Sequence, residues 1–508
     1  MGLLLGIDIG TSGTKTLLVN EAGEILAKDF CEYPLYQPRV GWAEQDPHDW
    51  WNAVCSTIKK VILKSNADAG DIKGVGLSGQ MHGLVLLDKD NIILRKAIIW
   101  CDQRSSKECE QITSLIGKDN LIKITANPAL TGFTASKIMW VRNNEPRIFE
   151  KANKILLPKD YIRFKLTGEF ATEVSDASGM QLMDISKRQW SSEILDKLQI
   201  DKDMLGTMYE SQQISGKINK DAAGLTGLKE GTLVVGGAGD QAAGAVGNGI
   251  VRSGVISSTI GTSGVVFASS TKMIVDPEGR VHTFCHALPN TWHIMGVTQG
   301  AGLSLKWFRD NFCAEEIKEA ELLKIDPYIL LTREAEKAVP GSDGLIYLPY
   351  LMGERTPHLD PNARGVFFGL SAKHQKQDMI RAVMEGVVFS LKDCLEIIKE
   401  MGIDVTEVRA SGGGSRSVLW SQMQADIFGA TITLPNSDEG PALGAAILAG
   451  VGAGTFNSVV EACDSIIKVK DKLVPDLALN GKYLKYYTIY KQLYKSLKQE
   501  FADLAEII

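Results

Sequence analysis

The pentapeptide Ile9-Gly10-Thr11-Ser12-Gly13 is repeated later in the chain as Ile260-Gly261-Thr262-Ser263-Gly264. Largely apolar segments flank both copies, at residues 3–9 and 15–19 around the first and at 254–259 and 265–268 around the second. Glycine lets a backbone approach a ligand closely, and hydroxyl side chains add donors next to the backbone N–H groups. A concave turn of this kind suits a phosphate group. A plain hairpin is the alternative for one copy alone, whereas two identical copies favour a pair of phosphate-binding turns.

The spacing around these turns does not match two other phosphate-binding loops. A P-loop requires Gly-x-x-x-x-Gly-Lys-Ser/Thr, and a dinucleotide-binding loop is followed by a helix. Here a second strand follows, then a turn at residues 20–23 and a third strand from Glu24 to Cys31, which is an antiparallel meander. This pattern resembles the α/β ATPase core of actin, the heat-shock chaperones and the sugar kinases. In that ribonuclease H-like fold, two related actin-like domains hold one ATP in the cleft between them.

The composition is that of an ordinary globular protein. The chain has 508 residues, and its 55 basic and 61 acidic side chains give a net charge of −6, which argues against nucleic acid as a partner. Eight cysteines without a Cys-x-x-Cys pair indicate reduced thiols. Residues 232–251 are rich in Gly and Ala but carry polar side chains, so no membrane partner is expected. The first strand begins without a basic leader, which predicts no signal peptide and a cytoplasmic location.

Polar residues follow several predicted strands. Asp46 and Pro47 form a helix start, as N-cap and first helical residue. The strand at residues 74–78 ends in a polar motif at 79–83, and the strand at 232–235 ends in a glycine-rich turn that carries Asp240. Because ligands gather at such strand ends in open α/β sheets, these turns are candidates for a substrate site.

The repeat also predicts where the chain divides. A boundary shortly before the second hairpin gives an N-terminal domain at residues 1–247 and a C-terminal domain at residues 254–508. Residues 105–230 are expected to be mostly helical and loop-like. Later helices are predicted from about Asp378 to Gly402, from about Ser417, and at the C-terminal end, where an apolar stripe indicates packing.

Motifs along nearly the whole chain resemble those of the FGGY family of carbohydrate kinases, and within it the xylulokinase branch. Residues 132–140 and 365–370 match the family, and residues 78–83, 284–289 and 353–358 match the branch. The resemblance implies transfer of a phosphoryl group from ATP to a ketopentose, which converts D-xylulose to D-xylulose 5-phosphate with the help of Mg²⁺.

The resemblance also implies a role for individual residues. Asp240 corresponds to the catalytic base and Asp8 to the carboxylate near Mg²⁺ and the phosphates. Met81 and His82 correspond to sugar-binding residues, and Gln241 stands where xylulokinases often carry Asn, with the same amide on a chain one methylene longer. The nucleotide is expected in the hairpins, at Thr11, Ser12, Thr14, Lys15, Gly261 and Thr262, and near the adenosine, at Gly302, Gly413 and Ser417.

Most of these residues have a purely structural alternative. Asp240 could cap a helix that starts near Ala242, Asp8 could lie on the polar face of a strand, and Met81 and His82 could be core residues. The resemblance favours the chemical role for each. Trp100 and Asp102, with Arg104, are expected to line the sugar pocket, with a surface salt bridge as the alternative.

Two further groups are interpreted as structural. His282, His286 and His293 lack a completing ligand at a recognisable zinc spacing, which favours structural roles. Glu354 and Arg355 are expected to form a buried pair that orders the cleft.

Other functions remain open at this stage. A kinase of ribulose, gluconate or glycerol differs from a xylulokinase only in a few pocket contacts. A nucleotide-driven chaperone would need a peptide-binding domain, yet kinase-like motifs continue to residues 440–444. A sugar-responsive regulator would need a DNA-binding segment, for which the chain offers no candidate. The oligomeric state is left open, with a homodimer as one option.

Overall fold

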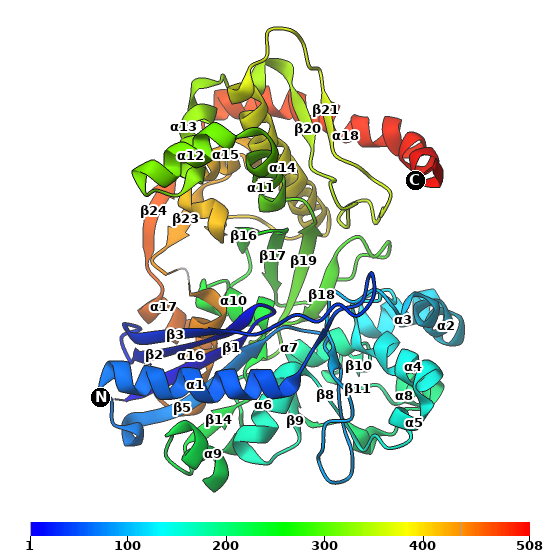
Figure 1. Cartoon of the computed structure of the whole chain (residues 1–508), viewed down its shortest axis with the longest axis vertical. Coiled ribbons are helices and arrows are strands. Elements are labelled where there is room, and N and C mark those ends of the chain that lie inside the picture. Colours follow the sequence, from blue (N-terminus) through cyan, green and yellow to red (C-terminus); the bar gives the residue numbers. More distant parts are fainter. Residues whose placement is uncertain (1, 438, 508) are drawn as a thin grey trace.

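The computed structural model describes residues 2–437 and 439–507. The chain forms two α/β lobes, each built on a seven-stranded sheet, with the first sheet in the lower lobe of Figure 1 and the second in the upper lobe. The predicted two-domain architecture is therefore confirmed.

The first sheet begins with the predicted meander. Strands β1 (Leu3–Ile9), β2 (Gly13–Asn20) and β3 (Ile25–Glu32) pair in antiparallel fashion, with the first pentapeptide as the turn between β1 and β2. On the other side of β1, the parallel strands β5 (Ile72–Gly79) and β14 (Leu233–Val235) extend the sheet. The strand order is β13-β14-β5-β1-β2-β3, where β13 is Ile214–Lys217, and β15 (Ala238–Gly239) pairs with β5.

The second sheet repeats this topology. Its meander consists of β16 (Val255–Ile260), β17 (Gly264–Ser270) and β19 (Trp292–Thr298), with the second pentapeptide between β16 and β17. The parallel strands are β22 (Glu407–Ser411) and β23 (Ile432–Pro435). Edge strands β18 (His282–Cys285) and β24 (Val469–Leu473) complete the order β18-β19-β17-β16-β22-β23-β24. The duplicated sequence thus marks a duplicated fold.

Several helices begin where the sequence predicted. Helix α1 (Pro47–Ser65) has Asp46 as its N-cap, whose side chain accepts a hydrogen bond from the His48 N–H. Helix α15 (Val418–Phe428) is capped in the same way by Ser417. The helix predicted from about Asp378 to Gly402 is α14 (Lys376–Glu400), and the helix predicted at the C-terminal end is α18 (Leu477–Ile507). None of the described helices combines the length and apolar character needed to cross a membrane.

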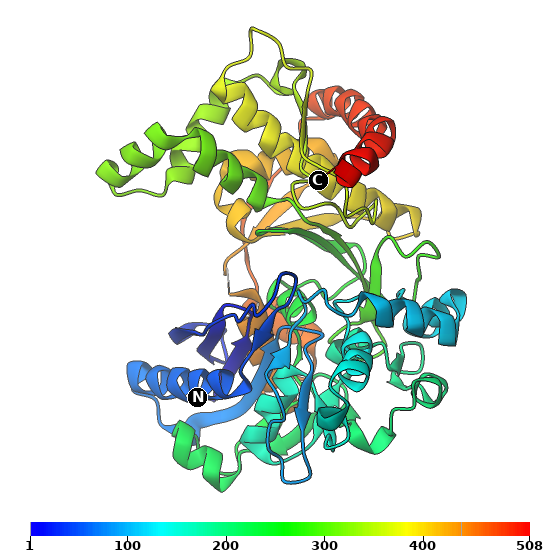
Figure 2. The ribbon, with the colours of Figure 1, turned by 45° about the vertical axis from the view of Figure 1, so that its right-hand side comes forward.

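One helix from late in the sequence packs in the first lobe. Helix α16 (Gly440–Gly452) lies against β1 and β5 and against α10 (Asp240–Gly247), and it lies in the lower lobe in both views (Figures 1 and 2). The α10–α16 contact is very close, since a Cβ atom on Gly444 would lie 1.9 Å from the Ala243 carbonyl oxygen. The division at residues 1–247 and 254–508 stays a prediction, and in space α16 belongs with the first sheet.

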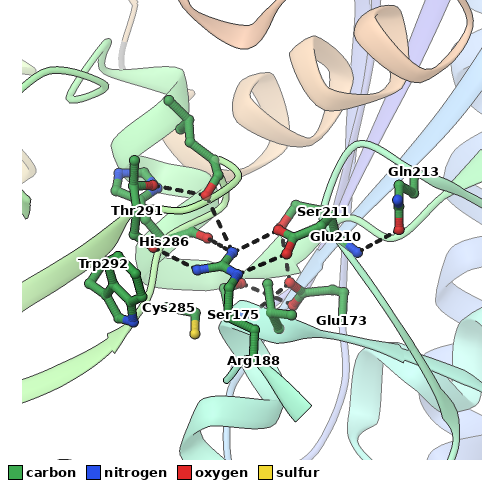
Figure 3. Close-up of polar contacts among 12 residues, drawn as sticks. Glu173, Ser175, Arg188, Glu210, Ser211, Gln213, Cys285, His286, Thr291 and Trp292 are labelled. Carbon is green, nitrogen blue, oxygen red and sulfur yellow. Dashed lines mark hydrogen bonds and ion pairs between the residues drawn. The ribbon is translucent and has the colours of Figure 1, made fainter. Parts of the chain in front are cut away.

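Arg188 links the two lobes at another point (Figure 3). Its guanidinium donates to the Glu210 carboxylate at 2.8 and 2.7 Å, within the first lobe. It also donates to the Thr291 carbonyl oxygen at 2.8 Å, in the turn between β18 and β19 of the second lobe. The same turn is held by His286, whose Nε2 donates to the Ile250 carbonyl oxygen at 2.9 Å, in the segment that connects the lobes.

Candidate active site

The first hairpin turn is held from outside by side chains of its own lobe. Within the turn, the Gly10 N–H donates to the Gly13 carbonyl at 3.1 Å. The Tyr33 hydroxyl donates to the Gly10 carbonyl at 2.5 Å, and the Gln45 amide donates to the Thr11 carbonyl at 2.7 Å. These bonds fix the turn carbonyls, so the turn is preorganised for a ligand on its other side. Ser12 at the tip is exposed.

The second hairpin turn is held by the start of a helix. The Gly261 N–H donates to the Ser263 carbonyl at 3.0 Å, and the Gly302 N–H at the start of α11 (Gly302–Phe312) donates to the Gly261 carbonyl at 2.8 Å. A Cβ atom on Gly302 would lie 2.4 Å from that carbonyl oxygen. Gly302 is therefore glycine because of this close approach, whether or not a nucleotide also binds there.

Replacing Gly261 by valine tests the second turn as a phosphate site. A Cβ atom on Gly261 would lie 3.6 Å from its nearest contact, the Ser263 carbonyl oxygen, so the folded protein has room for it. We expect the variant to fold but to bind ATP at least about tenfold more weakly, a loss of about 1.4 kcal/mol, because the side chain blocks the approach of a phosphate. Calorimetry with ATP and with the sugar checks this, and an unchanged ATP affinity would contradict it.

Asp240 is the first residue of α10, and Gly239 occupies the N-cap position without a side-chain cap. The alternative role of Asp240 as a helix cap is therefore wrong. Burial raises the pKa of its carboxyl to about 7, and the nearby Asp8 carboxylate adds to this rise. A carboxyl group with a pKa near neutrality is suited to accept a proton.

Asp8 lies near the carboxyl end of β1, next to the first turn. The Ser78 hydroxyl donates to its Oδ1 at 2.9 Å. Burial raises the pKa of Asp8, and the Ser78 hydrogen bond and the Lys15 ammonium partly oppose this rise. The two carboxylates of Asp8 and Asp240 are thus close enough to repel each other, and a cation between them would relieve this repulsion.

A cavity of about 200 Å³ lies between the lobes. Helix α10 contributes its first turn, and the second sheet contributes the ends of strands that carry hydroxyl side chains. The lining residues are Asp240, Gln241, Gly244, Ala245, Asn248, Ser257, Thr259, Phe267, Ser411, Gly412, Gly440 and Pro441. A larger surface hollow of about 340 Å³ is lined by Glu315, Glu316, Glu319 and Glu334 together with Gln375, Lys376 and Gln377, and the Lys376 ammonium lies 2.9 Å from the Glu316 carboxylate. Its acidic lining would repel a phosphate, so the cavity between the lobes is the better site.

His82 has three features of a constrained functional residue. Its φ of 68° lies in the left-handed region, which is uncommon for a residue other than glycine. Its Nδ1 lies 3.0 Å from the Gly179 carbonyl oxygen, so Nδ1 carries the proton and donates, which leaves Nε2 as an acceptor. Burial and the Lys137 ammonium lower its pKa to about 3, so the ring is neutral.

The other predicted sugar residues lie in different surroundings. The Trp100 indole is 38% exposed and donates to the Thr11 hydroxyl at 2.9 Å, which connects it to the first turn. Met81 is buried, and a Cβ atom on Gly239 would lie 2.8 Å from its Cγ, so Met81 packs directly beside the turn that carries Asp240.

Asp102 is placed differently from the prediction. It is fully buried, and its carboxylate accepts hydrogen bonds from the Ala43 N–H at 2.6 Å and from the Arg104 guanidinium at 2.7 Å. Arg104 in turn lies over the Trp42 ring at 3.7 Å. A salt bridge was the alternative to a sugar contact, and the structure shows the salt bridge, although inside the lobe rather than at the surface.

The predicted nucleotide residues are not all exposed. Thr14 is fully buried on β2, below the turn. Lys15 is paired, since its ammonium lies 2.9 Å from the Glu439 carboxylate just before α16. Gly413 is exposed with open space around it, and Ser417 accepts a hydrogen bond from the Trp420 N–H as the N-cap of α15. The nucleotide-binding role of these residues therefore stays a prediction.

Comparison with known proteins identifies the family. The model of the FGGY carbohydrate kinase N-terminal domain matches residues 3–247, and that of the C-terminal domain matches residues 256–453. The chain belongs to the FGGY family of carbohydrate kinases. The resemblance seen in the motifs is confirmed, and as a carbohydrate kinase the chain takes a sugar and ATP as substrates.

Several relatives of this FGGY kinase are xylulose kinases. The chain is 40% identical to the xylulose kinase of Bacillus subtilis (strain 168), with 98% of each chain covered, and 39% identical to that of Escherichia coli (strain K12), with 97% and 99% covered. A crystal structure of a xylulose kinase from Brucella ovis is 37% identical and covers 98% of this chain and 99% of its own, with a TM-score of 0.89. A gluconokinase of Bacillus licheniformis is 35% identical, with 99% and 97% covered.

The sequence did not single out the side chains that support the first turn of this FGGY kinase. Gln80 donates to the Gln45 side chain at 2.7 Å, and Gln45 and Tyr33 hold the turn carbonyls. Gln80 lies within the motif at residues 78–83, so the sequence contained a signal that could have identified it as a residue that supports the turn. Glu439, the partner of Lys15, lies 424 residues away in sequence, and no local pattern connects the two.

The histidine and Glu354 expectations have separate outcomes. His282, His286 and His293 are buried among aromatic rings, and within residues 2–437 and 439–507 no group of three or more His, Cys, Asp or Glu side chains is placed to hold a metal ion. Glu354 is buried as predicted, but its carboxylate accepts from the Thr298 hydroxyl at 2.6 Å and from the Arg355 backbone N–H at 2.7 Å. No ion pair in the described part of the chain joins the two side chains, so the predicted Glu354–Arg355 pair is wrong.

Replacing His82 by alanine tests its role in sugar binding. If Nε2 accepts a hydrogen bond from a sugar hydroxyl, the variant should show a KM for the sugar about 10- to 100-fold higher, which corresponds to about 1.4–2.8 kcal/mol. The KM for ATP should change less. Exposed His48 on α1 offers a control, since His48→Ala should leave both constants unchanged. A lower melting temperature with an unchanged sugar KM would show that His82 is structural.

Proposed function

We propose that this FGGY kinase transfers the γ-phosphoryl group of ATP to D-xylulose and produces D-xylulose 5-phosphate. One observation carries the proposal: Asp240, with a pKa near 7, lines a cavity between two lobes that each contain a phosphate-type hairpin. The names of the relatives favour xylulose as the sugar.

The proposed base is Asp240. As the sugar hydroxyl attacks the γ-phosphorus, the bond to the β–γ bridging oxygen breaks, ADP leaves with that electron pair, and the Asp240 carboxylate accepts the hydroxyl proton. Phosphoryl transfer depends mainly on positioning and charge stabilisation, so the site needs one base and a preorganised phosphate site in which the negative charge is neutralised. Gln241 follows on the same first turn of α10, where its amide can bond to sugar hydroxyls beside the base.

Two helix N-termini would add to the phosphate site. Both α10 and α16 begin at residues that line the cavity, Asp240 and Gly440. Free N–H groups and the helix dipole make an N-terminus attractive to anions. The turn N–H groups of the hairpins and the hydroxyls of Thr11 and Thr262 are the other donors of the proposed site.

The residues present fit a magnesium ion. Asp8 and Asp240 place two carboxylates near each other, and Mg²⁺ is usually held by one or two carboxylates together with phosphate and water. Asp8 is the proposed ligand from the protein. When bound, Mg²⁺ would neutralise negative charge on the phosphates. Ser78 would hold the Asp8 carboxylate in place through its 2.9 Å hydrogen bond.

The proposed sugar site extends from Asp240 toward His82. Met81, His82, Gln241 and Trp100 are the proposed contacts. Gluconate is the competing substrate, because a gluconokinase is also among the relatives, and ribulose and glycerol are further alternatives. ADP release measured across D-xylulose, L-xylulose, D-ribulose, gluconate and glycerol tests the assignment. A preference for any sugar other than D-xylulose, or a product phosphorylated at another position than O5, would contradict it.

The proposed enzyme is cytoplasmic and acts on small molecules alone. The net charge of −6 supports the expectation that nucleic acid is not a partner. The oligomeric state is left open, with a homodimer as one option that sedimentation analysis would test.

A further inference from the structure

The turn that carries Asp240 is anchored to a separate segment of the first lobe. Residues 236–239 connect β14 to α10 and include the short strand β15. At the start of the turn, the Arg163 guanidinium donates to the Gly236 carbonyl oxygen. At its end, the Gly239 N–H donates to the Ser175 hydroxyl oxygen at 3.0 Å. Because Gly239 directly precedes Asp240, this second bond fixes the backbone from which the Asp240 side chain extends.

Ser175 itself is held in a single orientation by Glu173 (Figure 3). The Ser175 hydroxyl donates to Glu173 Oε1 at 3.0 Å, and the Ser175 N–H donates to Glu173 Oε2 at 2.8 Å. A serine hydroxyl has one proton to donate, so its lone pairs are directed to the Gly239 N–H. Both residues are fully buried.

Glu173 is fixed in turn by three further partners, one of which is the Asp176 N–H, which donates to Glu173 Oε1 at 2.8 Å. The Ser211 hydroxyl donates to Glu173 Oε2 at 2.9 Å. The buried Lys159 ammonium lies 3.5 Å from Glu173 Oε1 and 3.0 Å from the Asp160 carboxylate. In a buried environment of low dielectric, hydrogen bonds between charged partners are strong and restrict the motion of the side chains. The anchor of the Asp240 turn is therefore a rigid polar network and not a flexible loop contact.

We propose that Ser175 is a positioning residue for the base Asp240, acting through the Gly239 N–H. The proposal rests on the role proposed for Asp240 above. Without the Ser175 hydroxyl, the Gly239 N–H loses this acceptor and the first turn of α10 is free to shift. A displacement of about 1 Å at a reacting group can lower a rate by roughly 100-fold.

The chain offers a matched control for Ser175→Ala. Ser211 is equally buried, and its hydroxyl donates to the same carboxylate at nearly the same distance, 2.9 Å against 3.0 Å. Its backbone carbonyl accepts from the Gly237 N–H of the Asp240 turn at 2.8 Å, a bond that alanine would keep, but among the described residues its hydroxyl makes no bond to the turn. We expect Ser175→Ala to lower kcat by about 10- to 100-fold, with the KM for sugar and for ATP within about threefold of wild type. Ser211→Ala should destabilise the protein similarly and lower kcat far less.

A double-mutant cycle with Asp240→Asn tests whether Ser175 acts through the base. If it does, adding Ser175→Ala to Asp240→Asn should leave the residual kcat unchanged. If Ser175→Ala folds poorly, Ser175→Cys keeps nearly the same volume with a weak acceptor, and it should also lower kcat at unchanged KM.

The outcomes distinguish the two proposals. Two results would overturn the positioning role while leaving Asp240 as the base. One is an equal loss of kcat in Ser175→Ala and Ser211→Ala. The other is that Ser175→Ala lowers kcat by the same factor in the wild type and in Asp240→Asn. A wild-type kcat in Asp240→Asn would remove the base itself, and with it the positioning role.

Discussion

Replacing Asp240 by asparagine should lower kcat by about 10²- to 10⁴-fold, the range usual for loss of a general base. Asparagine has nearly the same size and can still hydrogen-bond to a sugar hydroxyl, but it cannot take a proton. Affinity for the sugar and for ATP should therefore change little. The measurements are steady-state kcat and direct binding by calorimetry. A kcat within about threefold of wild type would exclude Asp240 as base, and Asp8 would be the next residue to test.

The pH dependence offers a second measurement on the same residue. Only the ionised carboxylate can act as a base, and burial and the Asp8 charge raise the pKa of Asp240 to about 7. The kcat/KM reports the pKa of the free enzyme, so it should fall about tenfold per pH unit below neutrality. Bound Mg²⁺ would lower this pKa by favouring the charged form, which shifts the acidic limb to lower pH.

The same raised pKa has a consequence for stability. An aspartate in the unfolded chain titrates near its ordinary value of 3.8, while in the folded protein Asp240 titrates at about 7. Between these two values the folded state binds more protons, so stability is lost as pH rises through this window. Asp240→Asn removes the cost of a buried charge, and we expect a higher melting temperature at pH 8 than for wild type. A gain in stability when a catalytic charge is removed is common, because active sites often sacrifice stability for activity.

The sequence predicted features that depend on residues close together in the chain. The two hairpins, the Asp46 cap of α1 and the turn before Asp240 each depend on a few neighbouring residues whose conformational preferences are local. Asp102 shows the limit: its place after a strand predicted a pocket residue, but its surroundings include Ala43 and Arg104, and burial there depends on the fold of the whole lobe. The pairing of Lys15 with Glu439 could not be predicted from the sequence either, because it also depends on the fold of the whole lobe.

The packing of α16 in the first lobe is the largest feature that the sequence did not predict. Its residues alternate small and apolar types on all sides, so periodicity cannot say which surface it covers. Helix α16 can approach β1 and β5 this closely because residues 6 and 76 are glycines. A Cβ atom on Gly6 or Gly76 would lie 1.9 Å from an α16 carbonyl oxygen. These glycines have no turn to explain them, and they are explained only by this contact.

The second large effect is expected from Gly444→Ala at the α10–α16 contact. The new Cβ atom would lie 1.9 Å from the Ala243 carbonyl oxygen and 2.9 Å from the Gly247 nitrogen, both on α10. Backbone atoms cannot rotate away, so the two helices must separate by more than about 1 Å, and close-packed interiors resist such shifts. We expect the free energy of unfolding to fall by about 3 kcal/mol or more, at the upper end of overpacking costs.

A control for this substitution lies on the last helix. Gly481 on α18 is exposed, and a Cβ atom added there would have no described neighbour within 4 Å, so Gly481→Ala should be neutral or slightly stabilising. Thermal unfolding of both variants gives the comparison. A Gly444→Ala protein that unfolds at the wild-type temperature would show that the contact yields easily.

The same variant should also lose activity, because both helices point their N-termini into the cavity. Asp240 begins α10, and Gly440 begins α16 directly after the Glu439 that pairs with Lys15. Separating the helices therefore moves the proposed base relative to the first hairpin. We expect kcat to fall by about tenfold or more in the fraction that remains folded, while Gly481→Ala keeps the wild-type kcat. Loss of stability with full kcat per folded molecule would mean that the α10–α16 spacing supports the fold but does not set the geometry of the site.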